Sequence, residues 1–257
     1  MTKIPYVSQT WETTGGCSKC SSGCQGCYAI RQIWRLAHNP ATGDRYKGLV
    51  EKVNGKYQWT GKVKLFEDRL DQPLHWRQPR SVFVNSRSDT FHPDVNIGFL
   101  THVFDAIEQC PQHKFLILTK RPERTLKMMW GKHGEGWRYF GDDDFHKNIY
   151  LGTTICNQAE KVKGDILRTI PAAYRWWSIE PLLENLGYLN LEGVDWLVVG
   201  CESGPNRRPC KIEWMIDVVE QCKAAGVKVL VKQVSINGKV SHNMAEWPGK
   251  LRERETI

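Results

Sequence analysis

The chain has 257 residues, a formal net charge of +8, nine cysteines and eleven tryptophans. This length suits one large domain, and no window approaches the roughly 20 consecutive apolar residues that cross a bilayer, which argues against a membrane protein. The first residues are short and mixed rather than a secretory signal, so we expect a cytoplasmic protein whose clustered thiols bind metal instead of forming disulfides. The positive charge and the tryptophans favour a polyanionic partner such as nucleic acid.

The first part of the chain surrounds a dense group of thiols. Residues 6–11 alternate weakly and indicate a first strand, and residues 28–38 have the apolar spacing of a helix. Residues 42–66 differ in character and contain Asn54-Gly55 between two alternating segments, a pattern typical of a hairpin. We interpret residues 42–66 as a hairpin insertion. Its exposed surface is expected to be either basic and aromatic, through Arg45, Tyr46, Lys47, Tyr57 and Trp59, or an ordinary solvated one.

Short apolar runs then alternate with helical patterns. We expect strands at residues 81–85, 114–119, 148–152, 174–178, 195–199 and 227–231, and helices at 97–110, after Pro122 and at 211–225. Strands that alternate with helices form parallel βαβ units, and the chain has no glycine fingerprint for a dinucleotide. The sequence therefore predicts an α/β fold: an open or partial (β/α) barrel of about six to seven parallel strands, in a single domain of residues 1–257.

Polar side chains follow each expected strand. In such a barrel the chemistry lies on the loops that leave the carboxyl ends of the strands. Any one of these loops alone would be read as a helix cap or a surface ion pair, but together they indicate a shared site. The candidate residues on these loops are Ser86, Asp89, Lys120, Arg121, Asn157, Glu180, Cys201, Glu202 and Lys232.

The loop between the first strand and the first helix contains Cys17, Cys20, Cys24 and Cys27. A zinc site usually takes its four ligands from two separated pairs, whereas these thiols form one compact run. The spacing Cys20-x3-Cys24-x2-Cys27 is that of a loop that holds three irons of a four-iron cluster. The fourth iron would then be open to a substrate or cofactor. The run therefore predicts a metal site on the same face as the polar loops.

Several motifs follow in one order along nearly the whole chain. They include Ser22-x-Cys24-x-x-Cys27-Tyr28-Ala29, Trp76-Arg77-x-Pro79-Arg80, Val82-Phe-Val-Asn-Ser-x-Ser-Asp89, Leu118-Thr-Lys-Arg-Pro122, Glu180-Pro-Leu-Leu183 and Gly200-x-Glu-Ser-Gly204. In these motifs the chain resembles a phage-associated family of uncharacterised three-cysteine proteins that is related to radical S-adenosylmethionine (SAM) enzymes. The resembling proteins often lack a cysteine at Cys20, which implies Cys17, Cys24 and Cys27 as ligands. The wider superfamily's spacing implies Cys20, Cys24 and Cys27 instead.

The resemblance implies a [4Fe-4S] cluster, SAM and an external one-electron reductant. Reductive cleavage of SAM would give a 5′-deoxyadenosyl radical that abstracts a hydrogen atom from the substrate. By the same resemblance, Ser86 and Asp89 would bind the amino group of SAM, and Lys120 or Arg121 its carboxylate. Asn157 and Glu180 would contact its ribose or adenine. Glu202, Ser203 and Lys232 would face the substrate. Cys201 would be either a hydrogen-atom donor to a substrate radical or a small replacement for the glycine that the resembling proteins have there.

The phage association, the charge and the tryptophans together suggest DNA or a modified nucleotide as the substrate. The expected reaction is a radical rearrangement, an isomerase activity, or another modification of a hypermodified thymine or other pyrimidine in phage DNA, within the host cytoplasm. A DNA repair reaction like that of photoproduct lyase is an alternative. A non-catalytic, zinc-stabilised nucleic-acid-binding protein is another, but it would need no convergent polar site beside its metal.

Overall fold

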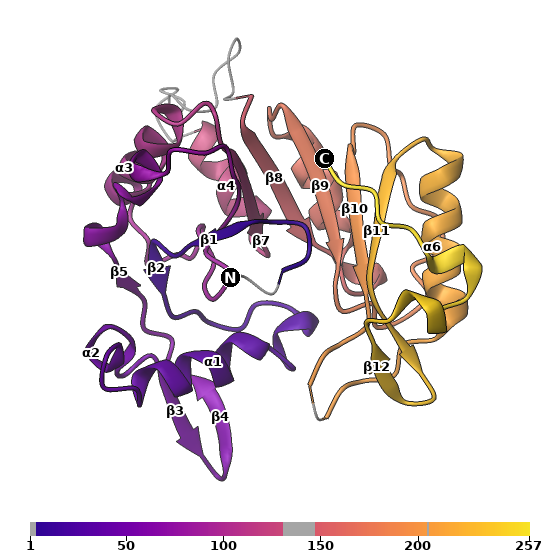
Figure 1. The fold of residues 1–257 in the computed structure, drawn as a ribbon, viewed down its shortest axis with the longest axis horizontal. Helices are drawn as coiled ribbons and strands as arrows, with labels where there is room; N and C mark the ends of the chain where they lie inside the picture. The colour runs from indigo at the N-terminus through magenta and orange to yellow at the C-terminus, as the bar shows by residue number, and fades with distance from the viewer. Residues whose placement is uncertain (1–3, 131–146, 205) are drawn as a thin grey trace.

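The computed structural model describes residues 4–130, 147–204 and 206–257. Its main feature is an eight-stranded sheet with the order β1-β6-β7-β8-β9-β10-β11-β12, in which all pairs are parallel except β11 with β12 (Figure 1). The strands of this sheet are β1 (Gln9–Trp11), β6 (Ser81–Val84), β7 (Lys114–Thr119), β8 (Ile149–Thr154), β9 (Tyr174–Ile179), β10 (Trp196–Gly200), β11 (Lys228–Ile236) and β12 (Lys239–Ser241). Two smaller sheets pair β2 (Thr14–Gly15) with β5 (Lys64–Leu65) and β3 (Val50–Val53) with β4 (Lys56–Trp59).

The α/β class and the mostly parallel sheet are confirmed, and the sheet is open rather than closed into a barrel. Strand β1 forms one edge, where it pairs with β6, and β12 forms the other. Strand β12 returns antiparallel to β11 through a tight turn in which Asn237 and Gly238 have φ values of 48° and 72°. This returning strand occupies the edge of β11 that a closed barrel would present to β1. Within the described residues no strand pairing closes the sheet.

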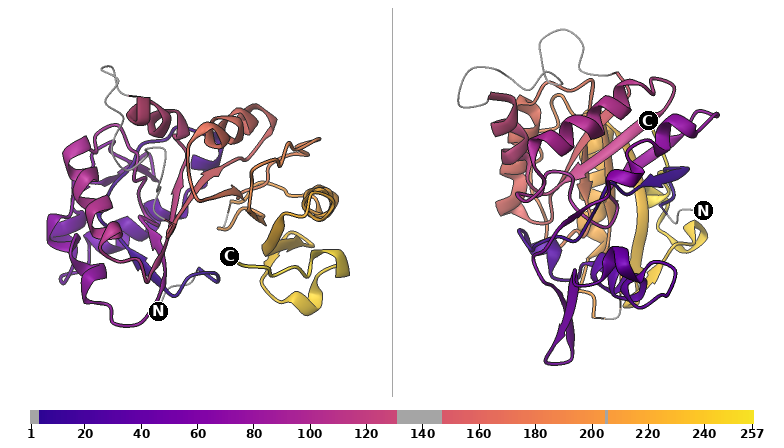
Figure 2. Two further views of the ribbon diagram at one scale, coloured as in Figure 1. Left: turned by 90° about the horizontal axis from the view of Figure 1, so that it is seen from above. Right: turned by 90° about the vertical axis from the view of Figure 1, so that its left-hand side faces the viewer.

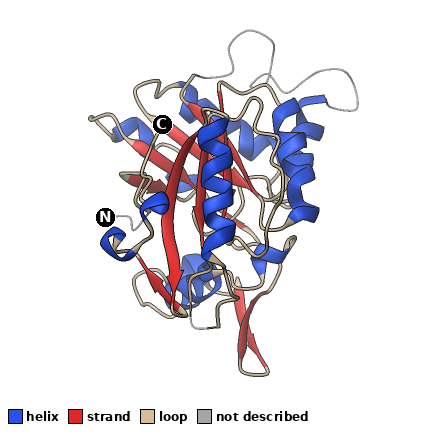
Figure 3. Ribbon diagram, turned by 90° about the vertical axis from the view of Figure 1, so that its right-hand side faces the viewer, coloured by secondary structure: helices blue, strands red, loops and turns tan. Residues whose placement is uncertain are grey.

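Helices follow most of the parallel strands. They are α1 (Tyr28–Ala37), α2 (Gly43–Tyr46), α3 (Ile97–Glu108), α4 (Pro122–Trp130), α5 (Lys161–Thr169) and α6 (Ile212–Ala224). Asn96 caps the N-terminus of α3, where its side chain accepts a hydrogen bond from the Phe99 amide, and α6 is followed by Gly226 at φ 69°. Figure 3 shows α6 lying along one face of the strands. No helix in the described part of the chain is long and apolar enough to span a membrane.

The two faces of the sheet have different coverings. Alternate residues of the strands, such as Val84, Ile117 and Val229, join the helices in one large core. The opposite face carries a second, aromatic cluster that includes Phe83, Trp176 and Trp196. Near the N-terminus, the ring of Tyr6 lies against this cluster, with its centroid 5.0 Å from that of Trp196. Aromatic side chains therefore cover the second face of the sheet, and the site described below lies beside them.

The insertion contains the expected hairpin, which projects from the body in the right-hand view of Figure 2. Asn54 and Gly55 join β3 to β4 with positive φ values of 48° and 77°. The expectation of an exposed aromatic surface is wrong for Tyr46, which is 3% exposed because its ring packs edge-on against Phe66. The Tyr57 ring lies 4.9 Å from Trp34 of α1, so the hairpin is anchored on that helix.

Candidate metal and ligand site

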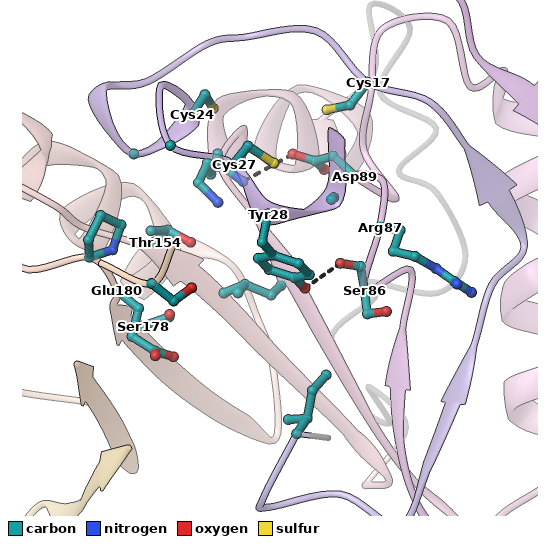
Figure 4. A pocket seen from close by; sticks show the side chains of 18 of the residues that line it. Cys17, Cys24, Cys27, Tyr28, Ser86, Arg87, Asp89, Thr154, Ser178 and Glu180 are labelled. Carbon is teal, nitrogen blue, oxygen red and sulfur yellow. Dashed lines mark hydrogen bonds between the residues drawn. The ribbon is translucent and has the colours of Figure 1, made fainter. Parts of the chain in front are cut away.

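One pocket lies at the carboxyl ends of the parallel strands, and its wall includes the cysteine loop (Figure 4). The figure shows the thiols of Cys17, Cys24 and Cys27 on one side and Thr154, Ser178 and Glu180 on another. Most of the residues that the sequence predicts for a site meet in this wall. They are Cys17, Cys24, Cys27, Ser86, Asp89, Lys120, Arg121, Glu180, Cys201, Glu202 and Lys232.

Asn157 is the predicted residue that does not line this pocket. Its side chain caps a short 3-10 helix (Gln158–Glu160) by accepting a hydrogen bond from the Glu160 amide at 3.0 Å. Its amide nitrogen donates to the hydroxyl of Ser22, also at 3.0 Å. Asn157 therefore holds the cysteine loop against the loop after β8 rather than facing a ligand.

The four clustered cysteines differ in position. Cys17, Cys24 and Cys27 line the pocket, whereas Cys20 is exposed and does not. Among the described residues, no group of three or more His, Cys, Asp or Glu side chains is arranged to hold a metal ion. The three pocket thiols nevertheless provide the ligand type and number that a [4Fe-4S] cluster with one open iron takes from a protein. The three thiols suit such a cluster chemically, although their sulfur atoms are not arranged around one common position.

The electrostatic environment of the thiols is mixed. Burial raises the pKa of Cys17 to about 11 and also raises that of Cys27. A hydrogen bond from Cys20 and the charge of Lys120 lower the pKa of Cys24 to about 4. Burial alone would lower the pKa of Lys120, but Cys24, Cys156, Cys27 and Asp89 together outweigh it, so the pKa is raised and the ammonium keeps its proton. A cation thus lies beside the thiols and favours their ionised form.

The start of the cysteine loop is fixed by Arg121. This guanidinium donates to the carbonyl oxygen of Ser18 at 2.8 Å and lies 3.9 Å from the Cys17 sulfur. It also forms a buried ion pair with Asp89 at 2.9 Å. The Asp89 carboxylate further accepts the Thr119 hydroxyl and the Lys120 amide, at 2.8 and 3.1 Å. Asp89 is therefore fully engaged in holding the loops after β6 and β7 in place.

The middle of the loop is fixed by Glu160. Its carboxylate accepts the amide and the hydroxyl of Ser22 at 3.0 and 2.9 Å, and the amide of Cys156 at 3.0 Å. Burial opposes the ionisation of Glu160, but Lys163 and these hydrogen bonds outweigh it and lower its pKa. Glu160 thus joins the cysteine loop to the end of β8.

The Cys24–Cys27 segment rests on Glu202. The Glu202 carboxylate accepts hydrogen bonds from the backbone amide of Arg208 at 2.8 Å and from its guanidinium Nε at 2.9 Å. The Nη2 of Arg208 makes a further short contact with the same carboxylate. Arg208 in turn donates to the Ser22 carbonyl at 2.9 Å. A Cβ at Gly26 would lie 2.6 Å from the Glu202 carboxyl carbon, so the loop can lie this close only because residue 26 is glycine. Glu202 acts here as a support for the loop.

A buried carboxylate also holds the loop after β6. Glu12, 2% exposed, accepts the amides of Ser86 and Arg87 at 3.2 and 3.3 Å. The hydroxyl of Tyr28, at the start of α1, donates to the Ser86 carbonyl at 2.6 Å (Figure 4). The Ser86 hydroxyl is bonded to Glu12 as well. Glu12 and Tyr28 therefore position this side of the pocket.

The opposite side is formed by β9, β10 and β11. Glu180 pairs with Lys232 at 3.1 Å, and both side chains line the pocket. Cys201 lies beside them and is 2% exposed, and burial raises the pKa of its thiol to about 11. The thiol of Cys201 is therefore neutral at physiological pH.

Sequence reasoning did not identify Glu12, Glu160, Tyr6 and Arg208 as part of this region. The carboxylate of Glu12 follows a strand, which is a usable signal for a site residue. Glu160 lies within a helical pattern and gives no such signal, because its partner Ser22 is 138 residues away.

A family model described as "Protein of unknown function (DUF5131)" matches residues 1–255. Comparison with the curated proteins gives no match. Comparison with the solved structures gives none either.

Proposed function

The chain belongs to DUF5131, a family of proteins of unknown function, and we propose that it is a radical SAM enzyme that modifies a base of DNA. The observation that carries this proposal is the meeting of three thiols with the polar strand ends in one pocket. Perturbed, convergent polar groups in a concave site are typical of catalysis rather than of a structural metal. In this proposal the open parallel sheet is a partial (β/α) barrel.

We assign Cys17, Cys24 and Cys27 as the ligands of a [4Fe-4S] cluster. Cys20 has the spacing of a ligand, but its exposed thiol lies outside the pocket wall. The Cys20 thiol lies 4.0 Å from the Lys120 carbonyl oxygen, to which it donates, and the Ser21 hydroxyl lies 3.5 Å from the Cys24 sulfur. The Arg121, Glu160 and Glu202 supports hold the loop at three points, which fixes the position of its thiols against the strand ends.

When bound and reduced, a cluster of this kind cleaves SAM and supplies a radical that removes a hydrogen atom from the substrate. The chain's own groups would bind and orient the reactants. The Lys120 ammonium suits the carboxylate of SAM, because it lines the pocket and its pKa is raised, so that it keeps its charge. The side chains of Ser86 and Asp89 are already hydrogen-bonded to Glu12 and Arg121. They would therefore position the loop that binds the amino group of SAM.

Glu180, Lys232 and Cys201 would act on the other side of the pocket. The Glu180–Lys232 pair offers both an acceptor and a donor for a polar ligand. The neutral thiol of Cys201 is in the form that can give a hydrogen atom. An external one-electron reductant is required, and the reduced thiols suit the cytoplasm, of the host if the protein is phage-encoded.

The substrate class rests on charge and on the aromatic groups at the pocket. The net charge of +8 favours a polyanion, and Tyr28 and Trp59 line the pocket where a base could stack. A base inside a duplex would have to flip out to enter. The favoured reaction is a rearrangement or other modification of a hypermodified pyrimidine, and a repair reaction is the alternative outcome.

The test is anaerobic reconstitution with iron and sulfide, followed by dithionite reduction with SAM and measurement of 5′-deoxyadenosine, with and without single-stranded DNA. Cys24→Ala removes a proposed ligand, and Cys110→Ala is the matched control because Cys110 is buried in the helical core. We expect product from the wild type and from Cys110→Ala but not from Cys24→Ala. A colourless, zinc-loaded protein that forms no product would favour a structural metal instead.

A further inference from the structure

Strand β11 is irregular where it reaches the pocket. Its register with β10 passes from Val199↔Val231 to Gly200↔Gln233, so Lys232 has no partner on β10. Neighbouring residues of a regular strand point to opposite faces, but a bulge re-aims one of them. Lys232 and Gln233 accordingly both line the pocket.

The amide of Gln233 is buried and held in one orientation. The residue is 4% exposed, and its Nε2 donates to the Cys201 carbonyl at 2.6 Å and approaches Glu180 Oε1 at 3.4 Å. Gly200 lies directly beneath, where a Cβ would be 3.2 Å from the Gln233 amide carbon. The orientation of the amide follows from these donors, because its nitrogen must face the two oxygens.

This orientation leaves the Gln233 oxygen without a partner. Oε1 is buried and has no hydrogen bond from the described protein, although native structures pair nearly all buried polar atoms. The buried Thr154 hydroxyl, also in the pocket wall, is unpartnered too. The wall therefore provides a buried acceptor that a ligand with an N–H or O–H group can satisfy.

The surroundings of Gln233 narrow the choice of ligand. Lys232, the preceding residue, has a partly exposed side chain whose ammonium can donate beside this acceptor. Tyr6 and Phe83 add aromatic surface to the same wall. A flat ring with an N–H next to a carbonyl complements this arrangement, because its N–H meets Gln233 and its carbonyl meets Lys232.

We propose that Gln233 recognises the ring N–H of a base that carries a carbonyl beside it, as thymine does and cytosine does not. This inference rests on the proposed function and names the substrate class of its site. Cytosine would place a ring nitrogen lone pair against Oε1, so two acceptors would face each other. Gln233 is thus a specificity-determining residue.

The experiment measures equilibrium binding of three nucleotides to the anaerobically reconstituted protein: thymidine 5′-monophosphate, its N3-methyl derivative and deoxycytidine 5′-monophosphate. The wild type should bind the first about ten- to a hundredfold more tightly than either of the others, the effect of leaving a buried acceptor unpaired. In Gln233→Leu this ratio should fall close to one. Gln109→Leu, at an exposed position near the end of α3, is the matched control and should keep the wild-type ratio.

A general disturbance of folding would weaken all three nucleotides together and leave their ratio unchanged, so the ratio separates recognition from structure. An unchanged ratio in Gln233→Leu would overturn the inference. If Gln233→Leu kept the wild-type ratio of nucleotide affinities but bound SAM more weakly, the inference would also be overturned, and Gln233 would be assigned to the adenine of SAM. Failure of the proposed function would give a different result: the wild type would form no 5′-deoxyadenosine, whatever the ratio of its nucleotide affinities.

Discussion

Gly26→Ala tests whether the Glu202 support fixes the cysteine loop. The added Cβ would lie 2.6 Å from the Glu202 carboxyl carbon, closer than real contacts allow, so the carboxylate must withdraw. Withdrawal breaks its hydrogen bonds with Arg208, whose side chain is 29% exposed while that of Glu202 is 6% exposed. Hydrogen bonds to a charged group contribute about 1.5–3 kcal/mol, less where solvent screens them. We expect a loss of about 2–3 kcal/mol in the free energy of unfolding.

The assay is urea unfolding of the metal-free protein, followed by tryptophan fluorescence. Gly249→Ala is the matched control, because a Cβ there meets nothing within 4 Å. In a Glu202→Ala background the clash is gone, so Gly26→Ala should then cost less than about 1 kcal/mol. Equal costs for Gly26→Ala and Gly249→Ala, or the same cost of Gly26→Ala in both backgrounds, would refute the role of Glu202.

Other consequences can be measured separately. Cys20→Ser should retain the wild-type ratio of iron to protein in colorimetric analysis, and a loss of iron as complete as in Cys24→Ala would make Cys20 a ligand. Thr154→Val and Thr125→Val each remove a buried hydroxyl without a partner. Both substitutions should change the free energy of unfolding by less than about 1 kcal/mol. Only Thr154→Val, which lies in the pocket wall, should weaken nucleotide or SAM binding in titration calorimetry. Because the pKa of Glu160 is lowered, its ionised form stabilises the fold above its unfolded pKa, and that contribution is lost as pH falls through the folded pKa. Glu160→Gln should therefore be about 1–3 kcal/mol less stable than the wild type at neutral pH and close to it in acid. A stability difference in urea unfolding that does not vary with pH would count against the hydrogen-bond network of Glu160. Burial raises the pKa of Cys201 to about 11, so its alkylation by iodoacetamide, followed by mass spectrometry, should be slow at pH 8 and speed up toward pH 11; reaction at pH 8 as fast as that of an unfolded control would contradict a neutral thiol.

The presence and order of the parallel strands were predictable because local patterns determine them, although β11 extends to Ile236 and not to residue 231. The short, mostly apolar run at residues 114–119 matches β7 at both ends, and the Asn54-Gly55 pair specifies its own turn. Since parallel strands share a carboxyl edge, the polar loops had to converge on one side of the sheet. That reasoning brought most of the candidate residues into one pocket without knowledge of any contact.

The remaining features depend on long-range contacts that sequence patterns do not encode. Arg208 reaches the Ser22 carbonyl across 186 residues, and no spacing rule relates them. The bulge that turns Gln233 into the pocket arises from the register between two strands, not from the alternation within one. Tyr46 looked exposed because its segment is polar, but Phe66 of the same insertion covers it. The antiparallel edge strand β12, which pairs with β11, was likewise not among the predicted strands.

The most direct test of the central assignment is electron paramagnetic resonance of the anaerobically reconstituted, dithionite-reduced protein, recorded with and without SAM. The account predicts the signal of a reduced [4Fe-4S] cluster in the wild type and in Cys20→Ser, altered by SAM in both, and its absence in Cys24→Ala. A protein that holds zinc instead, or a cluster signal that survives in Cys24→Ala but is lost in Cys20→Ser, would contradict the assignment of Cys17, Cys24 and Cys27 as the ligands.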